Sequence, residues 1–144
     1  AESVAARVLA YCLEYREGLA FGPGLAEPDA PALAVRDLTG ALRAWIDVGA
    51  PDAARLHKAS KAAPRVAVYA FREPGPWLRG LAGARIHRAE ALELYALDRE
   101  LVGALAERIG RRVALTVSVT DRHLYVTLDG ETLEGDVERL TLGG

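Results

Sequence analysis

The amino-acid sequence predicts an α/β (α+β) domain in which helices flank one central mixed β-sheet. Three observations support this fold class. Segments with apolar residues at helical spacing alternate with short apolar segments typical of strands. Two of these strands form a hairpin, which precedes a helix and a strand buried on both faces. The length of 144 residues suits a single domain that buries a core without disulfides or metal ions.

The first predicted element is a helix over residues 2–17, because Val4, Val8 and Tyr11 recur at helical spacing. The following residues 18–31 are rich in Gly, Pro, Asp and Ala, which is typical of a loop. Four polar residues fall off the apolar stripe of the helix and are expected on a solvated face: Glu2, Arg7, Glu14 and Arg16.

The hairpin follows this loop, with Thr39-Gly40 as its turn. In that register Asp47 lies opposite Ala32, so Asp37 is about 17 Å from Asp47 at ~3.3 Å per residue. The two carboxylates therefore cannot share a metal ion, and Asp37 is expected to bond its own backbone in the turn. The two hairpin segments are residues 32–37 and 41–48.

The remaining elements are predicted from the same two patterns. Asp98 is expected to cap the last helix and Gly110 to end it. The tail after Asp129-Gly130 is expected to add one weak strand and then fray. In chain order the other elements are a helix over 51–63, a strand over 65–71, a helix over 77–88, a strand over 91–97, and strands over 113–119 and 123–128.

Composition argues against several classes of protein. The net charge of −2 argues against a broad basic surface for duplex DNA, although a local basic patch is compatible with it. No apolar run is long enough to span a membrane, and no signal peptide is visible. The single Cys12 cannot form an internal disulfide, so a cytoplasmic location and a buried, inert thiol are expected. The absence of Met, even at position 1, indicates a piece of a longer product.

A metabolic enzyme has no motif to support it. The chain has no Gly-rich phosphate loop, no nucleophile elbow and no His or Cys cluster at metal spacing. His57, His87 and His123 are isolated and are expected at the surface. No organic cofactor is expected, and the chain is expected to be a monomer.

One region suggests chemistry: a carboxylate at the end of the second hairpin strand, followed by a helix that carries both lysines of the chain. Lys58 on this helix could point back toward Asp47. A carboxylate there could hold Mg²⁺ (or Mn²⁺), and an ammonium could stabilise the charge that builds on a phosphate during hydrolysis. The alternative is that Arg55, Lys58 and Lys61 form a solvated helix face.

These residues lie in a set of short segments spread over most of the chain: Arg7-Val8-Leu9-Ala10-Tyr11, Asp37-Leu38-Thr39-Gly40, Trp45-Ile46-Asp47-Val48-Gly49, Pro51-Asp52 with Arg55 and Lys58, and Val66-Ala67-Val68-Tyr69. These segments resemble the YaeQ family, and the resemblance is strongest over residues 2–70. It implies a variant of the PD-(D/E)XK (restriction-endonuclease-like) nuclease fold, as one domain over residues 1–144 whose N-terminal strands precede this sequence.

The resemblance also implies roles for individual residues. Asp47 stands where the nuclease fold has the acidic residue of its Asp/Glu-x-Lys motif, whereas Gly49 stands where the motif has its lysine. Lys58 matches a lysine that the family carries on the following helix, and Glu2 matches an acidic residue that can assist the metal. The family has Pro-Asp where this chain has Pro and Ala32, so the second metal carboxylate is missing from its expected place.

Two hypotheses follow from this resemblance. The first is a Mg²⁺-dependent phosphodiesterase or nuclease with a degenerate site, which uses Asp47, Lys58 and Glu2 in catalysis. Its metal ligands would be Asp47 and Asp29, the latter only if the chain bends at Pro31. The second hypothesis is a nuclease-fold protein that no longer cuts and binds a nucleic acid or a protein partner.

Overall fold

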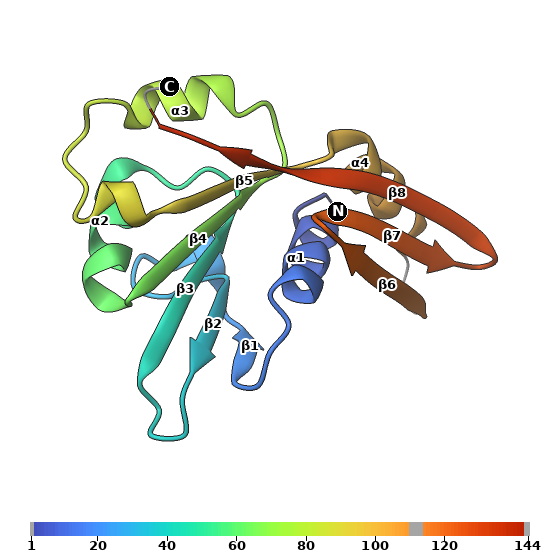
Figure 1. The fold of residues 1–144 in the computed structure, drawn as a ribbon, viewed down its shortest axis with the longest axis horizontal. Helices are drawn as coiled ribbons and strands as arrows, with labels where there is room; N and C mark the ends of the chain where they lie inside the picture. The colour runs from blue at the N-terminus through green and yellow to red at the C-terminus, as the bar shows by residue number, and fades with distance from the viewer. Residues whose placement is uncertain (1, 110–113, 143–144) are drawn as a thin grey trace.

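The computed structural model of this chain describes residues 2–109 and 114–142 (Figure 1). Its main elements are, in chain order, α1 (Glu2–Leu13), β1 (Leu19–Phe21), β2 (Leu33–Arg36), β3 (Leu42–Val48), α2 (Ala53–Ala62), β4 (Arg65–Ala70), α3 (Gly75–Leu81), β5 (Glu93–Leu97), α4 (Arg99–Arg108), β6 (Leu115–Thr120), β7 (His123–Leu128) and β8 (Glu131–Leu140). Two short 3₁₀ helices, η1 (Gly24–Ala26) and η2 (Ala89–Ala91), lie in the loops.

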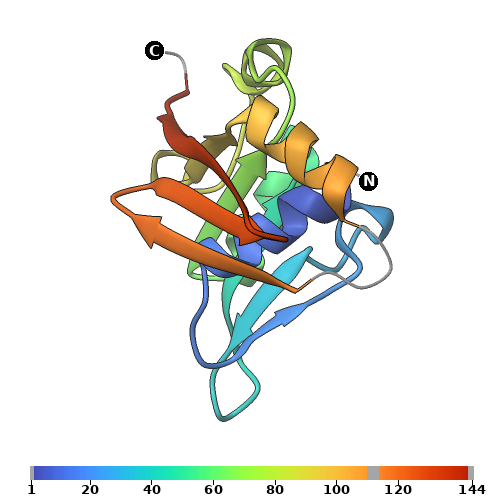
Figure 2. The same ribbon diagram turned by 90° about the vertical axis from the view of Figure 1, so that its right-hand side faces the viewer.

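The strands form one mixed sheet in the order β1-β2-β3-β4-β5-β8-β7-β6. The central strands β3, β4 and β5 run parallel, and every other neighbouring pair is antiparallel. The sheet curls, so that α1 and α4 lie against one another within its curve (Figure 1 and Figure 2). The predicted α/β class with a central mixed sheet is therefore confirmed.

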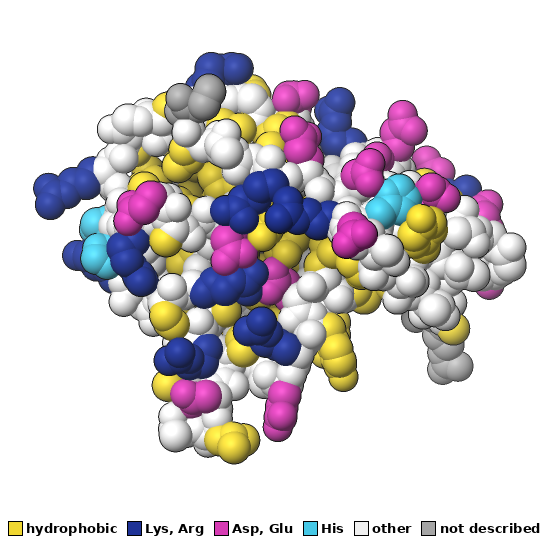
Figure 3. All heavy atoms as spheres, viewed as in Figure 1, with side chains coloured by type: hydrophobic (Ala, Val, Ile, Leu, Met, Phe, Trp, Pro, Cys, Tyr) yellow, Lys and Arg dark blue, Asp and Glu magenta, His cyan; other side chains and the backbone are white. Residues whose placement is uncertain are grey.

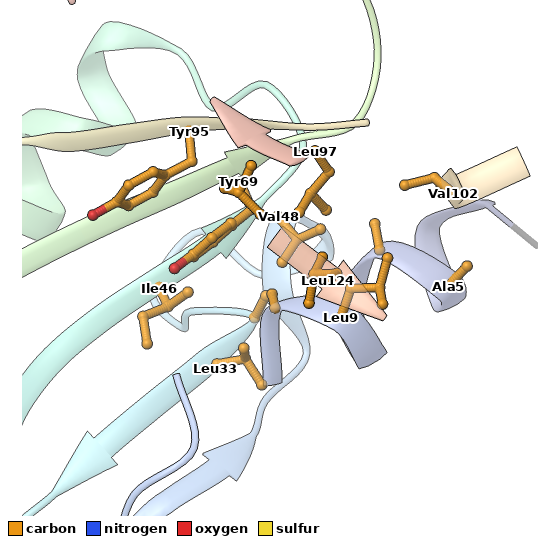
Figure 4. Packing of buried hydrophobic residues seen from close by; sticks show 14 of the residues in the cluster. Ala5, Leu9, Leu33, Ile46, Val48, Tyr69, Tyr95, Leu97, Val102 and Leu124 are labelled. Atoms are coloured by element: carbon orange, nitrogen blue, oxygen red, sulfur yellow. The ribbon is translucent and has the colours of Figure 1, made fainter. Parts of the chain in front are cut away.

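Apolar side chains cover both faces of the sheet. Within the curve, Leu9 of α1 packs with Val48, Tyr69 and Leu124 from the strands (Figure 4). On the outer face, α2 and α3 cover a second layer that includes Trp45, which is 2% exposed. Both crossovers between parallel strands place their helix, α2 or α3, on this outer face. No helix in the described part of the chain is both long and apolar enough to cross a membrane.

The hairpin register over residues 33–35 and the roles of Asp37 and Asp98 are as predicted, but the hairpin turn is not. The register shifts between Val35 and Arg36, so the turn spans Asp37 to Gly40 rather than Thr39-Gly40 alone. Leu33 pairs with Ile46, and this register sets Ala32 opposite Asp47, whose Oδ1 accepts a 3.4 Å hydrogen bond from the backbone N–H of Ala32. Asp37 closes its turn by accepting hydrogen bonds from the backbone N–H groups of Thr39 (2.9 Å) and Ala41 (3.0 Å). Asp98 caps α4 as expected, and Asp52 makes the same kind of cap on α2.

Several expected boundaries are wrong. The first helix ends at Leu13 rather than near residue 17, and the next residue, Glu14, places its side chain in a buried ion pair. The expected loop over 18–31 contains β1, which pairs with β2. The third helix ends at Leu81, well before residue 88. The expected end of α4 at Gly110 lies outside the described residues.

The C-terminal tail differs most from expectation. β8 is a ten-residue strand in the middle of the sheet, paired with β5 at one end and β7 at the other. It crosses the start of α4 so closely that a Cβ on Gly135 would stand 2.7 Å from Cβ of Asp98. A glycine at this core-facing position weakens the apolar alternation of the strand, which explains why the sequence pattern underestimates it.

Candidate functional site

Asp47 stands on β3, next to the C-terminal end of the strand, and is wholly buried. A buried carboxylate is stable only when it is paired, and its partner is Arg55 in the first turn of α2. Arg55 Nε donates to Asp47 Oδ2 at 2.7 Å and Nη2 donates to Oδ1 at 3.0 Å. The cap by Asp52, whose Oδ1 accepts from the backbone N–H of Arg55 at 2.9 Å, fixes this turn against the strand.

Arg55 also holds the loop that leads into β2. Its guanidinium donates to the backbone carbonyls of Glu27 (2.6 Å) and Ala30 (2.7 Å), and its Cζ lies 5.3 Å from the centre of the Trp45 ring. Every polar end of the side chain is therefore engaged. This arrangement makes the Asp47–Arg55 pair a clamp between β3, α2 and the loop before β2.

The structure gives Lys58 a different carboxylate from the one expected. Lys58 pairs with Asp29, and both side chains are largely exposed, at 55% and 72%. No ion pair or hydrogen bond joins Lys58 to Asp47 in the described residues. Exposed pairs of this kind contribute little to stability, and the lysine remains accessible to solvent.

Glu2 lies in the exposed first turn of α1. Its Oε2 stands 3.8 Å from the point that a Cβ on Gly103 would occupy, so the carboxylate lies beside α4. The structure therefore brings together two pairs, Asp47 with Arg55 and Asp29 with Lys58, and holds Glu2 apart from both.

These carboxylates do not form a cation site as they are arranged. Mg²⁺ takes oxygen ligands in near-octahedral geometry, commonly from one or two carboxylates. Both oxygens of Asp47 already accept hydrogen bonds from Arg55, and Asp29 is held by Lys58. Within residues 2–109 and 114–142, no three His, Cys, Asp or Glu side chains are grouped for a shared metal ion. The donor set does not suit Mg²⁺ without a rearrangement of Arg55.

A cavity of about 430 Å³ lies at the C-terminal ends of the parallel strands β3 and β4. We call it the strand-end cavity. Asp47 does not line it, because successive side chains of a strand point to opposite faces and the neighbouring Val48 takes the cavity side. Its lining residues are Ser3, Arg7, Pro23, Gly24, Ala32, Val48, Gly49, Ala50, Ala70, Phe71, Arg72, Glu73, Pro74 and Trp77.

Two arginines make the lining of this cavity basic. Arg7 of α1 donates to the carbonyls of Gly22 and Ala32 and packs its guanidinium near the Phe21 ring. Arg72 is exposed, with its Cζ 5.4 Å from the centre of the Phe71 ring. Glu73 is the only acid among the described lining residues, so the cavity favours an anion.

Comparison with known proteins identifies the relatives of this chain. A family model described as YaeQ protein matches residues 1–137. The chain belongs to the YaeQ family. "Uncharacterized protein YaeQ" from Escherichia coli (strain K12) is 27% identical over 135 residues, which cover 92% of this chain and 74% of that protein. The protein of the same name from Shigella flexneri matches with the same identity and coverage.

Solved YaeQ structures agree with the fold described above. The YaeQ protein from Pseudomonas syringae superposes with a TM-score of 0.84 at 29% identity, over 97% of this chain and 78% of that one. The YaeQ protein from Xanthomonas axonopodis pv. citri gives a TM-score of 0.82 at 26% identity, over 98% of this chain and 80% of that one. The resemblance to YaeQ proteins in the sequence is thus confirmed.

This YaeQ-family chain also contains a polar cluster that its sequence does not predict. Glu14, expected on a solvated face, is buried where α1 meets the start of β4. Arg65 donates to both of its oxygens, at 2.6 and 3.0 Å, and to both oxygens of Glu93, at 2.8 and 3.0 Å. Tyr69 donates to Glu14 and Tyr95 donates to Glu93, and the two tyrosine rings stack 4.9 Å apart. Burial and the Glu14 carboxylate raise the pKa of Tyr69, so its hydroxyl remains a donor.

The histidines of this YaeQ-family chain are not isolated, contrary to expectation. His57 Nδ1 accepts a 2.9 Å hydrogen bond from the backbone N–H of His87. Partial desolvation, with Lys61 and other cations nearby, lowers the pKa of His57. His123 lies between two carboxylates, 2.6 Å from Asp136 and 3.1 Å from Glu134, and the hydrogen bond to Asp136 is the main reason that its pKa is raised.

Proposed function

We propose that this YaeQ-family chain has a nuclease-like, PD-(D/E)XK-type fold that binds the phosphate backbone of a single-stranded nucleic acid without cleaving it. The strand-end cavity is the proposed site. The main observation behind the proposal is that Asp47 is fully paired with Arg55 and is not free to bind a metal ion. Both of its carboxylate oxygens accept from one guanidinium, and Asp47 is wholly buried.

The lining of the cavity supports binding over cleavage. Ala32 and Gly49 line it, and these are the positions at which the resemblance implies a metal carboxylate and a lysine. Their small side chains leave space where a nuclease would place its reacting groups. Cationic groups on the same walls remain, in Arg7 and Arg72. A phosphate could therefore be held there, while the groups that activate water are absent from those two positions.

The position of the cavity in the sheet also supports this proposal. Ligands of open α/β sheets bind in the crevice outside the carboxyl ends of parallel strands. The cavity lies at that edge of β3 and β4, and Ser3 in the first turn of α1 adds a hydroxyl to its wall. Arginine suits phosphate because its planar guanidinium presents several donors in a fixed geometry.

Trp77 offers an intrinsic probe of this site, because it lines the cavity and its indole N–H donates to the carbonyl of Pro51 at 2.7 Å. We expect a short single-stranded oligonucleotide to change the Trp77 fluorescence in a saturable, salt-sensitive manner. Arg72→Gln should weaken the affinity and lower the slope of log K against log salt by about 0.7 for one lost phosphate contact.

The matched control is Arg43→Gln, an exposed arginine on β3 that lies outside the cavity lining. Arg72 is preferred to Arg7 for the test because Arg7 also holds two backbone carbonyls. Equal binding by the wild type, Arg72→Gln and Arg43→Gln would show that the strand does not occupy the cavity and would contradict the proposal.

A further inference from the structure

A second cavity, of about 300 Å³, lies at the other end of α1, where the helix meets the N-terminal edge of β4. We call it the tyrosine cavity. Among the residues that the structure describes, it shares none of its lining with the strand-end cavity. Three tyrosines and three arginines make up most of its lining: Tyr15, Arg16, Arg65, Tyr69, Tyr95 and Arg122.

The floor of the tyrosine cavity is a closed set of hydrogen bonds. Arg65 holds Glu14 and Glu93 through two contacts each, and Tyr69 and Tyr95 donate to the same two carboxylates. Each of these side chains already has a hydrogen-bond partner within the cluster. The floor therefore offers a ligand a surface to pack against but few free donors or acceptors. Recognition must come from the rim.

The rim, in contrast, presents exposed charged and aromatic groups. Arg16 and Arg122 are exposed and form no ion pair within the described residues, and Arg122 stands 5.7 Å from the centre of the Tyr95 ring. Tyr15 is 73% exposed, which leaves one of its ring faces accessible. Figure 3 shows one face of the molecule, on which basic side chains gather near the middle with acidic ones set among them.

We infer that the tyrosine cavity binds one nucleotide unit of a single strand, with its phosphate between Arg16 and Arg122 and its base against the Tyr15 ring. An open aromatic face beside guanidinium groups is the combination by which proteins bind single strands without reading sequence. An acidic peptide would pair with the arginines but would have no base to stack on the Tyr15 ring. This inference rests on the proposed function only for the class of ligand, since the two cavities are separate.

The test uses an oligothymidylate that carries 5-iodouracil, which cross-links on irradiation to an aromatic ring stacked against it. We expect the cross-link to map to Tyr15 in the wild-type protein. Tyr15→Ala should weaken binding about fivefold or more, because a base stacked on an aromatic side chain contributes about 1–3 kcal/mol. Tyr15→Phe should restore the affinity, because it keeps the ring. Tyr125→Ala, at another exposed tyrosine outside this cavity, is the control and should bind as the wild type does.

The arginines are tested by salt dependence. Arg16→Gln and Arg122→Gln should each lower the slope of log K against log salt by about 0.7. Wild-type affinity in Tyr15→Ala, or equal competition by polyglutamate, would overturn the inference. Loss of binding in the Tyr15 and Arg16 variants with no effect of Arg72→Gln would support this inference and contradict the strand-end site. The reverse pattern would contradict this inference alone.

Discussion

Asp47 and Arg55 form a fork-to-fork ion pair, in which Nε and Nη2 of the arginine reach the two oxygens of one buried carboxylate at 2.7 and 3.0 Å. The arginine side chain is 10% exposed and the aspartate side chain is not exposed at all. Water cannot replace either partner, so the pair fixes the relative position of β3 and α2. This geometry gives Asp47 a structural role and accounts for its absence from the lining of the strand-end cavity.

The first prediction concerns the stability of this pair. Arg55→Met leaves the Asp47 carboxylate buried without its cation, and we expect a loss of about 3–5 kcal/mol in the free energy of unfolding. The measurement is urea denaturation followed by circular dichroism. Lys58→Met on the same helix breaks an exposed pair with Asp29 and should cost less than about 1 kcal/mol. Similar losses in the two variants would show that the Asp47–Arg55 pair is not the structural clamp described here.

The second prediction compares the two carboxylates that share Arg65. The side chain of Glu14 is 6% exposed and that of Glu93 is 25% exposed. Glu14→Gln should therefore destabilise the fold by about 3 kcal/mol, and Glu93→Gln by about 1 kcal/mol, because the cost of an unpaired group rises with its burial. Thermal and urea unfolding of both variants measure this order. A larger loss for Glu93→Gln would mean that the polar cluster is supported from β5 rather than from α1.

The third prediction concerns pH. The hydrogen bond with Asp136, followed by that with Glu134, raises the pKa of His123 above its ordinary value of 6.5. A raised pKa in the folded state means that the protonated ring stabilises the fold below pH 6.5, and that this stabilisation is lost as pH rises through the folded-state pKa. His123→Gln should accordingly lower the melting temperature most below pH 6.5, at pH values where Asp136 and Glu134 are still charged.

Proton NMR titration provides an independent check on the histidines. His57 should titrate below His123, because desolvation and neighbouring cations lower the pKa of His57. An order in which His57 titrates above His123 would contradict the contacts described for both rings.

The fourth prediction concerns the close approach of β8 to α4. A Cβ at Gly135 would stand 2.7 Å from Cβ and 3.0 Å from Cγ of Asp98, so Gly135→Ala must shift the strand or the helix. We expect a loss of about 1–3 kcal/mol, the usual cost of an overpacked core. Gly80→Ala is the control, because a Cβ there meets nothing within 4 Å and alanine favours the helix. An unchanged stability in Gly135→Ala would show that β8 lies farther from α4 than described.

Contacts between residues close in the sequence could be predicted, whereas ion pairs between distant residues could not. The register that pairs Leu33 with Ile46, the turn at Asp37 and the cap at Asp98 depend on residues close in sequence, and all three are confirmed. Helical spacing alone could not choose between Arg55 and Lys58 as the cation for Asp47, since both lie on one face of α2. Glu14 is a clearer case, because its partner Arg65 lies 51 residues away and no local pattern marks the contact.

The cavities also could not be predicted from the sequence, because distant segments build them. The strand-end cavity is built by α1, the loop before β2, the ends of β3 and β4 and the start of α3, so no single segment carries its pattern. The sequence resemblance could mark Ala32 and Gly49 as departures from a nuclease motif. It could not show that both positions line one cavity with Arg7 and Arg72.

Binding without cleavage is tested most directly by incubating an end-labelled single strand with the protein and Mg²⁺ or Mn²⁺ and measuring bound and cleaved strand in the same samples. We expect the strand to bind and stay intact with the wild type and with Asp47→Asn. Products that accumulate with the wild type and disappear with Asp47→Asn would contradict the proposed function, because Asp47 would then act on the strand rather than hold Arg55.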